Sequence, residues 1–277
     1  MTHLCDSSRR GSSAAERGFH KAEVVGSNPT SGTAMQSRIF LGTLGVARLS
    51  IFMPVFKKKN RDFFKKWSTE MAYVLGFFCA DGCMFVNPRG AHYIAFYSND
   101  RHLLKFIRYA LRSEHKIGRR PTGKSRRQST AYVLQLGSKE VYHDLLRLGL
   151  LPGKEHRLKL PPVPAKYFSA FARGYFDGDG SVAYGLYKRR GRQKTTRVLL
   201  VRFTSASKKF LADLSQKIKK ELGVPGFLHF TANAWRLGYS TLPSMRLLAF
   251  LYQDGIKSLP VLGRKYHKFL QAAKTYA

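Results

Sequence analysis

Two stretches of the chain resemble each other, and both end in aspartate followed by glycine. The first is Val74-Leu75-Gly76-Phe77-Phe78-Cys79-Ala80-Asp81-Gly82, and the second is Ala172-Arg173-Gly174-Tyr175-Phe176-Asp177-Gly178-Asp179-Gly180. Asp179 follows Asp81 by 98 residues. Because small and aromatic residues recur at the same places in both stretches, we interpret them as two copies of one helix.

Each copy carries a stripe of small residues. They stand four positions apart, which places them on one face of a helix: Ala72, Gly76 and Ala80 in the first copy, and Ala170, Gly174 and Gly178 in the second. Glycine costs a helix about 1 kcal/mol relative to alanine, so close packing should compensate for it. We expect these six residues to form a domain interface across a pseudo-twofold axis.

The repeat extends beyond the two helices. Ile94-Ala95-Phe96-Tyr97-Ser98 resembles Val201-Arg202-Phe203-Thr204-Ser205, and Leu136-Gly137-Ser138 resembles Leu237-Gly238-Tyr239-Ser240, in the same order. Periodicity gives each copy the pattern αββαββα, so we predict an α+β fold of two pseudo-symmetric domains. The expected strands are 83–86, 92–97, 116–120, 131–136, 226–231 and 235–239, with a long hairpin within 182–204, and the further helices are 101–112, 139–147, 208–222 and 244–252.

Two boundaries divide the chain. The proline-rich stretch 160–164 indicates a linker, so we expect one domain over 53–160 and a second over 161–277. Residues 1–52 lack an apolar period. When they are back-translated, possible codons for this segment resemble a transfer-RNA gene, with Gly26-Ser27-Asn28-Pro29 in the place of the T-arm. We therefore expect residues 1–52 to be disordered or a spurious N-terminal extension.

Composition points to a polyanionic partner. Lys and Arg number 49 against 16 Asp and Glu, a net charge of +33. Such an excess favours nucleic acid, with an anionic membrane surface as the weaker alternative. The apolar run 39–56 is too short and interrupted for a membrane span. Three cysteines are too few for a disulfide framework, so we expect an intracellular protein in the cytoplasm, the nucleoid or an organelle matrix.

The repeated aspartates are unusual for their position. A carboxylate at a helix C-terminus opposes the macrodipole, and two packed helices would bring Asp81 and Asp179 together. A hard divalent cation with oxygen ligands, above all Mg²⁺, would relieve this repulsion. A simple Asp-Gly turn is the alternative. We expect Gly82 and Gly180 to provide left-handed C-caps.

The paired motifs resemble those of LAGLIDADG homing endonucleases of the double-motif, single-chain type, over about residue 53 to the C-terminus. The resemblance implies a site-specific endonuclease for double-stranded DNA, with an antiparallel β saddle and Mg²⁺-dependent phosphodiester hydrolysis. It implies Asp81 and Asp179 as catalytic residues, one per half, and as metal ligands with the adjoining Gly82 and Gly180. Cys79 departs from the family pattern, which often has an acidic residue there, but not at the catalytic position.

Basic clusters stand at hairpin tips in both halves. We expect them to contact DNA: Arg119, Arg120, Lys124, Arg126, Arg127, Lys188, Arg189, Arg190, Arg192 and Lys194. The resemblance also implies a basic or polar residue near the scissile phosphate, for which the candidates are Ser98, His143, Ser205, Arg246 and Lys265.

Alternative functions remain open within the same fold. An RNA maturase would prefer intron RNA, and a cleavage-deficient protein would only bind DNA. An intein endonuclease domain is disfavoured because no splicing blocks flank the repeat. The leading interpretation is a monomeric, intron-encoded enzyme that binds double-stranded DNA and no membrane.

Overall fold

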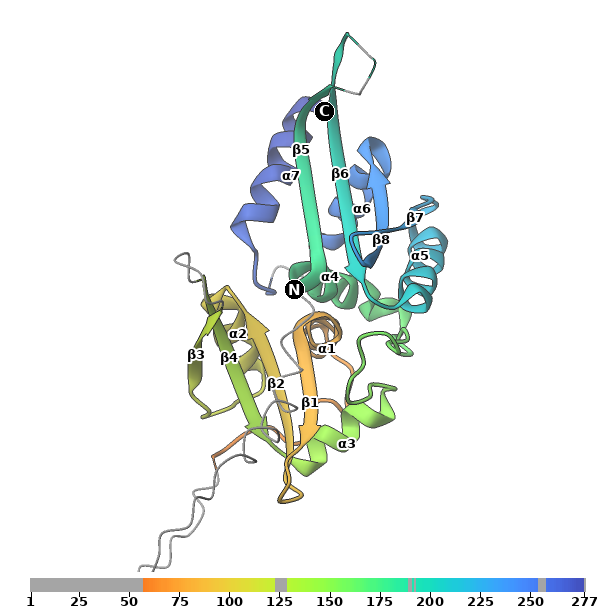
Figure 1. The fold of residues 1–277 in the computed structure, drawn as a ribbon. Helices are drawn as coiled ribbons and strands as arrows, with labels where there is room; N and C mark the ends of the chain where they lie inside the picture. Colours follow the sequence, from red (N-terminus) through yellow and green to blue (C-terminus); the bar gives the residue numbers. More distant parts are fainter. Residues whose placement is uncertain (1–56, 123–128, 189–190, 192, 254–257, 277) are drawn as a thin grey trace, which may run out of the picture. The chain divides into compact units, whose positions relative to one another are not determined.

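The computed structural model describes residues 57–122, 129–188, 191, 193–253 and 258–276 (Figure 1). The first half comprises α1 (Thr69–Asp81), β1 (Gly82–Val86), β2 (His92–Ser98), α2 (Arg101–Ala110), β3 (Ile117–Thr122), β4 (Ser129–Gly137) and α3 (Lys139–Arg147). The second half comprises the 3-10 turn η2 (Ala165–Tyr167), α4 (Phe168–Asp179), β5 (Gly180–Lys188), β6 (Thr195–Ser205), α5 (Lys208–Leu222), β7 (Phe227–Thr231), β8 (Ala234–Ser240), α6 (Thr241–Leu251) and α7 (Gly263–Tyr276).

Each half contains one four-stranded antiparallel sheet. The strand orders are β1-β2-β4-β3 and β5-β6-β8-β7, so the same topology occurs twice. The α+β fold of two αββαββα domains is therefore confirmed. Among the described residues no helix is long and apolar enough to cross a bilayer.

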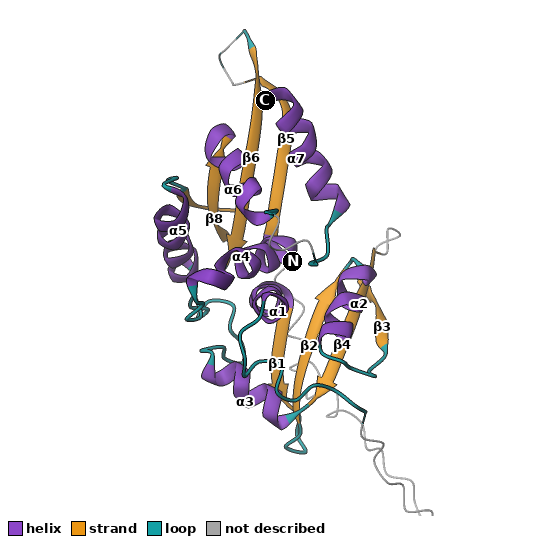
Figure 2. Cartoon of the chain, turned by 180° about the vertical axis from the view of Figure 1, so that it is seen from behind, coloured by secondary structure: helices purple, strands orange, loops and turns teal. Residues whose placement is uncertain are grey.

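Strand alternation explains why each sheet has one covered face. Along β6, Leu199, Val201 and Phe203 are fully buried, whereas the residues between them are half-exposed. Period-two alternation sends these two sets to opposite faces of the sheet. Helices lie against one face of each sheet and leave the other open (Figures 1 and 2).

Polar side chains define where the helices begin. Ser68, Ser138 and Ser207 accept a hydrogen bond from the backbone N–H three residues on, at the starts of α1, α3 and α5. Such caps satisfy backbone donors that have no partner within the helix. The bounds of α3 and α5 are those expected from the sequence.

Two features of the second half differ from expectation. Helix α6 begins at Thr241, three residues before the expected start, and includes Pro243 in its first turn. Proline is tolerated there because the first N–H groups of a helix have no acceptor within it. Helix α7 was not expected from the repeat, because the first half has no counterpart after α3.

Candidate functional site

Helices α1 and α4 pack backbone to backbone at their glycines. A Cβ built on Gly76 would lie 2.0 Å from the carbonyl oxygen of Phe171, and one on Gly174 would lie 2.0 Å from that of Tyr73. No side chain fits such a gap, so only glycine permits this approach. Ala72 and Ala170 are buried in the same core.

The close packing continues to the C-terminal ends of both helices. A Cβ on Gly178 of α4 would lie 2.5 Å from the Cβ of Ala80 and 3.1 Å from Oδ2 of Asp81 in α1. The carboxylate of Asp81 therefore lies against the last turn of the other helix. Asp179 follows Gly178 directly, so the geometry brings together the ends of the two helices and their aspartates.

The glycine after each aspartate has a role other than the expected one. Gly82 has φ −94° and ψ 154°, and Gly180 has φ −91° and ψ 156°, so both are extended and the prediction of left-handed caps is wrong. A Cβ on Gly82 would lie 2.3 Å from the ring of Phe78, and one on Gly180 would lie 2.1 Å from the ring of Phe176. Glycine is required because each helix passes directly into a strand beneath an aromatic ring.

The two carboxyl groups share one electrostatic environment. Burial raises the pKa of Asp81 to about 7, and the neighbouring charge of Asp179 contributes to the increase. Burial also raises the pKa of Asp179. Desolvation disfavours the charged form of an acid, and a like charge nearby adds to that effect. Near neutral pH the pair therefore readily holds a proton or a cation.

A buried lysine approaches the end of each helix. Nζ of Lys154 donates to the carbonyl oxygens of Cys79 at 2.7 Å and Ala80 at 3.4 Å in α1. Nζ of Lys265, in α7, donates to the carbonyl oxygens of Phe176 and Asp177 in α4, the latter at 3.0 Å. Both ammonium groups satisfy C-terminal carbonyls and oppose the negative end of a helix dipole.

The lysines also act on the aspartates. The charges of Lys154 and Lys265 lower the pKa of Asp81 and of Asp179, against the larger effect of burial. Burial in turn lowers the pKa of Lys265 to about 8 and also lowers the pKa of Lys154. The site thus combines two acids and two amines whose pKa values are all displaced towards neutrality.

Lys265 was among the residues considered from the sequence, whereas Lys154 was missed. Lys154 follows α3 in the turn Leu151-Pro152-Gly153, and no lysine stands at the equivalent place 98 residues later. A lone lysine in so basic a chain carries no sequence signal. Only its burial, at 8% exposure, distinguishes it.

The donor set fits a hard divalent cation in part. Two carboxylates at adjacent helix ends provide oxygen ligands, and Mg²⁺ is often held by one or two carboxylates with phosphate oxygens and waters completing its shell. Within the described ranges, no group of three or more His, Cys, Asp or Glu side chains could hold a metal ion.

The two serine candidates lie two residues beyond Phe96 and Phe203, which are the strand partners of Gly82 and Gly180. Oγ of Ser98 accepts from the N–H of Asp100, and buried Ser205 accepts in the same way from Ser207. These serines shape the turns between strand and helix. His143 is exposed on α3 with its ring against His92 and Tyr142, and Arg246 is exposed on α6.

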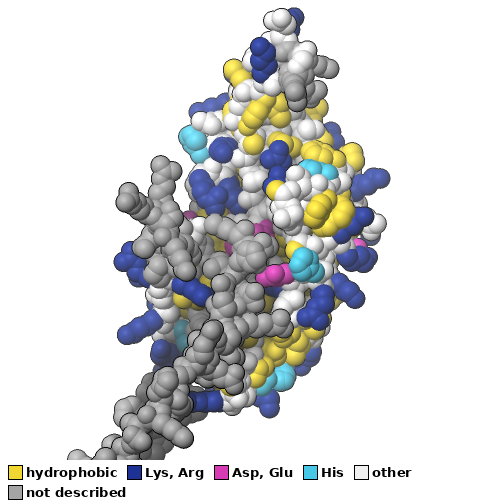
Figure 3. Space-filling model, viewed as in Figure 1, with side chains coloured by type: hydrophobic (Ala, Val, Ile, Leu, Met, Phe, Trp, Pro, Cys, Tyr) yellow, Lys and Arg dark blue, Asp and Glu magenta, His cyan; other side chains and the backbone are white. Residues whose placement is uncertain are grey.

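The basic residues expected to contact DNA are only partly described. Arg119 and Arg120 lie on β3, Lys188 ends β5, and Lys194 is exposed just before β6. Lys124, Arg126, Arg127, Arg189, Arg190 and Arg192 lie outside the described residues. Where Figure 3 shows the surface of described residues, Lys and Arg side chains are prominent and acidic ones are few.

The open face of the second sheet adds basic and aromatic residues that sequence reasoning missed. Strand pairing aligns Arg202 with Gly238 and Phe227, and aligns Arg236 with His229, on the face opposite the core. The rings of Phe227 and His229 stack with centroids 5.6 Å apart. The sequence signal for this basic face was an arginine at a position of each strand that alternates with the buried apolar residues.

The first sheet presents a different open face. Phe85 and Tyr93 stack there with ring centroids 5.4 Å apart, beside Gly137. Gln135 is exposed on the same face, two residues before Gly137 along β4 and paired with Ala95. The two sheets therefore share an aromatic pair near a repeated glycine but differ in charge.

Comparison with known proteins adds to this geometry. No curated protein is close enough in sequence to match the chain. A structure of meganuclease I-SmaMI bound to uncleaveable DNA with a TTCT central four is 14% identical, with a TM-score of 0.50, over 73% of this chain and 88% of that chain. The same meganuclease bound to uncleaveable DNA with a TTGT central four is 14% identical, with a TM-score of 0.50, over 76% and 88% respectively. The LAGLIDADG homing endonuclease I-LtrWI bound to target DNA is 12% identical, with a TM-score of 0.51, over 78% and 92%.

These structures share the fold of this chain at low sequence identity. The model of the LAGLIDADG-like domain matches residues 68–148 and again residues 167–240, which together exceed half of the chain. Each match contains one of the two helices that end in aspartate. The chain therefore belongs to the LAGLIDADG-like domain family.

Proposed function

We propose that this protein is a site-specific endonuclease that hydrolyses both strands of duplex DNA, with one aspartate from each half. The observation that carries the proposal is the meeting of Asp81 and Asp179 at the ends of two packed helices, where burial raises both pKa values. Structures of similar fold are bound to DNA, which supports the choice of substrate.

We propose that Asp81 and Asp179 bind Mg²⁺ together with oxygens of the DNA backbone. When bound, such an ion lowers the pKa of a coordinated water and offsets charge at the reacting phosphate. Lys154 and Lys265 hold the final turns of α1 and α4 through the backbone carbonyls, so they position both carboxylates. Their charges keep the carboxylates closer to the ionised form that binds metal.

The open faces of the two sheets are the proposed DNA surface. Arg202 and Arg236 lie on the second face. Of Arg119 and Arg120 on β3 of the first half, strand alternation places Arg120 on the open face. Paired strands can enter the major groove and read base edges there. Because one chain supplies both halves, we propose that it acts as a monomer. Both carboxylates are present, so an RNA maturase or a cleavage-deficient protein is less favoured.

The test begins with a target selected from a random duplex library and cloned into a plasmid. Asp81→Asn and Asp179→Asn should each reduce double-strand cleavage by ~10²-fold or more, which is the least effect of removing one preorganised hydrogen-bond donor from an active site. Binding of the duplex should change little, because the phosphate contacts lie elsewhere. Parallel reactions with Mg²⁺ and with EDTA test the metal requirement.

Asp213→Asn is the matched control, since it removes one carboxylate that pairs with Lys209 on α5. It should cleave like the parent protein. Parental cleavage by Asp179→Asn would reject the assignment of the site. Failure of the library to enrich any sequence would reject site-specific binding itself.

A further inference from the structure

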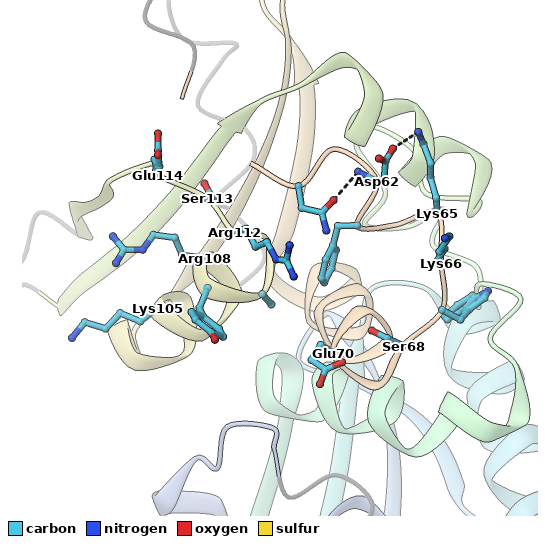
Figure 4. A pocket seen from close by; sticks show the side chains of 15 residues that line it. Asp62, Lys65, Lys66, Ser68, Glu70, Lys105, Arg108, Arg112, Ser113 and Glu114 are labelled. Atoms are coloured by element: carbon cyan, nitrogen blue, oxygen red, sulfur yellow. Dashed lines mark hydrogen bonds and ion pairs between the residues drawn. The ribbon is translucent and has the colours of Figure 1, made fainter. Parts of the chain in front are cut away.

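A groove of about 1200 Å³ lies between α2 and the segment that leads into α1 (Figure 4). Lys105, Arg108 and Arg112 line the α2 side, where Arg112 points into the groove and the other two extend along its outer edge, and Lys65 and Lys66 line the other side with Asp62 (Figure 4). None of these residues belongs to the aspartate site or to the open faces of the sheets. We call this feature the α2 groove.

The groove is a fixed part of the first half. The N–H of Asn60 donates to the carbonyl oxygen of Leu111 at 2.8 Å, which ties the segment before α1 to the end of α2. Phe63 and Phe64 of that segment are buried, with ring centroids 5.0 Å apart. The backbone that carries the basic side chains is therefore held in place both on α2 and on the segment before α1.

The charge of the groove is positive and incompletely neutralised. Lys105, Arg108 and Arg112 form no ion pair with any acidic residue in the described part of the chain. Two of the acidic residues that line the groove have partners. Asp62 pairs with Lys65, and the carboxylate of Glu114 accepts from the backbone N–H of Lys58. The α2 cations are thus available to an anionic ligand.

An aromatic side chain stands among these cations. Tyr109 lies on α2 next to Arg108 and is 83% exposed, the highest exposure of the large hydrophobic residues of the described structure. Exposed aromatic rings between Lys and Arg are typical of surfaces that bind single-stranded nucleic acid, where bases stack on rings and phosphates contact the cations. An acidic peptide would use the cations but gain nothing from the ring.

The groove is remote from the aspartates. Ser68 and Glu70, at the N-terminal end of α1, line the groove, whereas Asp81 ends the same helix. A helix of 13 residues is ~20 Å long at 1.5 Å per residue. Ligands at these two places would therefore contact opposite ends of α1.

We infer that the α2 groove binds a segment of single-stranded nucleic acid, with phosphates on Lys105, Arg108 and Arg112 and a base on Tyr109. This binding goes beyond the proposed cleavage of duplex DNA and is independent of it. The chemistry admits RNA and DNA strands, which the test distinguishes.

The test measures fluorescence anisotropy of labelled U20 RNA and labelled dT20 DNA with the full chain, previously saturated with unlabelled 30-base-pair duplex. Lys105→Gln/Arg108→Gln/Arg112→Gln removes the α2 cations. Lys209→Gln/Lys219→Gln/Lys220→Gln removes the same charge from α5, the equivalent helix of the second half. Tyr109→Ala and Tyr109→Phe separate the ring from the charge. Duplex binding by each variant shows that it is folded.

The duplex-saturated parent protein should bind a labelled strand, and the α2 triple variant should lower that affinity about tenfold or more. For this variant, the slope of the logarithm of the binding constant against the logarithm of salt concentration should become shallower by about 2. Each phosphate contact to a single strand contributes ~0.7 to that slope. Tyr109→Ala should weaken binding about fivefold or more, from the loss of one stacked base, and Tyr109→Phe should retain it. Tighter binding of U20 than of dT20 would assign the groove to RNA, and equal binding would assign it to either strand.

Three results would overturn the inference. The duplex could displace the strand completely, which would place both ligands on one surface. The α2 and α5 variants could lose affinity equally, which would make the effect one of net charge. Polyglutamate could compete as well as U20 while Tyr109→Ala has no effect, which would identify a site for acidic protein.

Discussion

Helices α1 and α4 occupy equivalent places but differ in chemistry at two positions. Leu75 and Cys79 of α1 correspond to Arg173 and Asp177 of α4. All four side chains are buried. One helix therefore buries two apolar groups where the other buries an ion pair. Burial raises the pKa of the Cys79 thiol to about 12, so it remains protonated.

The ion pair of α4 belongs to a larger buried network. Nε of Arg173 donates to Oδ2 of Asp177 at 2.9 Å, and its other nitrogens donate to the carbonyl oxygens of Leu251 and Pro260. The hydroxyl of Tyr73, in the first half, donates to the same Oδ2 at 2.8 Å. Oδ1 of Asp177 has no hydrogen-bond partner among the described residues, so the network stabilises the buried ion pair through one carboxylate oxygen.

The difference separates two kinds of feature in the duplicated fold. Gly76 and Gly174 are present in both helices because two backbones cannot meet without them. Arg173 has no counterpart in α1. Its guanidinium binds backbone carbonyl oxygens at the end of α6 and before α7, and the described residues of the first half include no segment equivalent to α7. Shared residues therefore form the backbone contact and the paired carboxylates. The unshared ion pair holds the chain between α6 and α7 and also accepts a hydrogen bond from Tyr73 across the interface.

The largest effect on the free energy of unfolding is expected when one partner of the Arg173–Asp177 ion pair is removed. Arg173→Leu leaves the carboxylate of Asp177 buried beside Tyr73 without its guanidinium, which should cost ~3–5 kcal/mol of unfolding free energy. Arg173→Leu/Asp177→Cys installs the residues found in α1 and should recover at least half of that loss. Urea unfolding measures both. A double variant as unstable as the single one would mean that the halves are not interchangeable at these positions.

Glycine substitutions should affect the two halves alike. Gly76→Ala and Gly174→Ala each place a Cβ 2.0 Å from a carbonyl oxygen of the other helix. Alanine favours a helix by about 1 kcal/mol, but separating the helices should leave a net cost of ~1–3 kcal/mol. Gly263→Ala in α7 is the control, because nothing lies within 4 Å of its Cβ. Unchanged thermal unfolding of Gly174→Ala would contradict the observed packing.

Removing either buried lysine should move the pH profile of cleavage. Lys154→Met and Lys265→Met remove charges that lower the pKa values of Asp81 and Asp179. Those pKa values should rise, so ionised carboxylates are reached only at higher pH. Single-turnover cleavage at pH 7 should fall about tenfold for each pH unit of displacement. If the profile keeps its position while the rate falls, the lysines act by packing and not by charge.

The last prediction concerns the free energy of unfolding and its pH dependence when the carboxylate of Asp81 is removed. The folded-state pKa of Asp81 is raised to about 7, so its ionisation disfavours folding and stability declines as pH rises from about 4 through 7. With EDTA at pH 8, Asp81→Asn should therefore be more stable than the parent and should unfold at a higher temperature. At pH 4 the gain should vanish. A gain of equal size at both pH values would exclude a titration effect, and Asp213→Asn controls for net charge.

The sequence determined the elements whose signals are local or repeated. The bounds of α3 and α5 followed from periodicity, and the 98-residue repeat related Asp81 to Asp179. Helix α7 has no counterpart in the first half, so the repeat could not predict it. The open faces were only partly predicted, because the basic clusters in the sequence stand at loop tips, whereas Arg202 and Arg236 are single residues within apolar strands.

Tertiary structure alone decided the chemistry around the carboxylates. Lys154 comes from a turn 73 residues after Asp81, and its ammonium reaches α1 only because the chain folds back onto that helix. The raised pKa of Asp81 likewise requires burial and the approach of α4. Gly82 is needed because the ring of Phe78 lies over the start of β1, and not for a left-handed turn. Desolvation and the packing of distant groups depend on the folded arrangement, so residue types alone could not specify them.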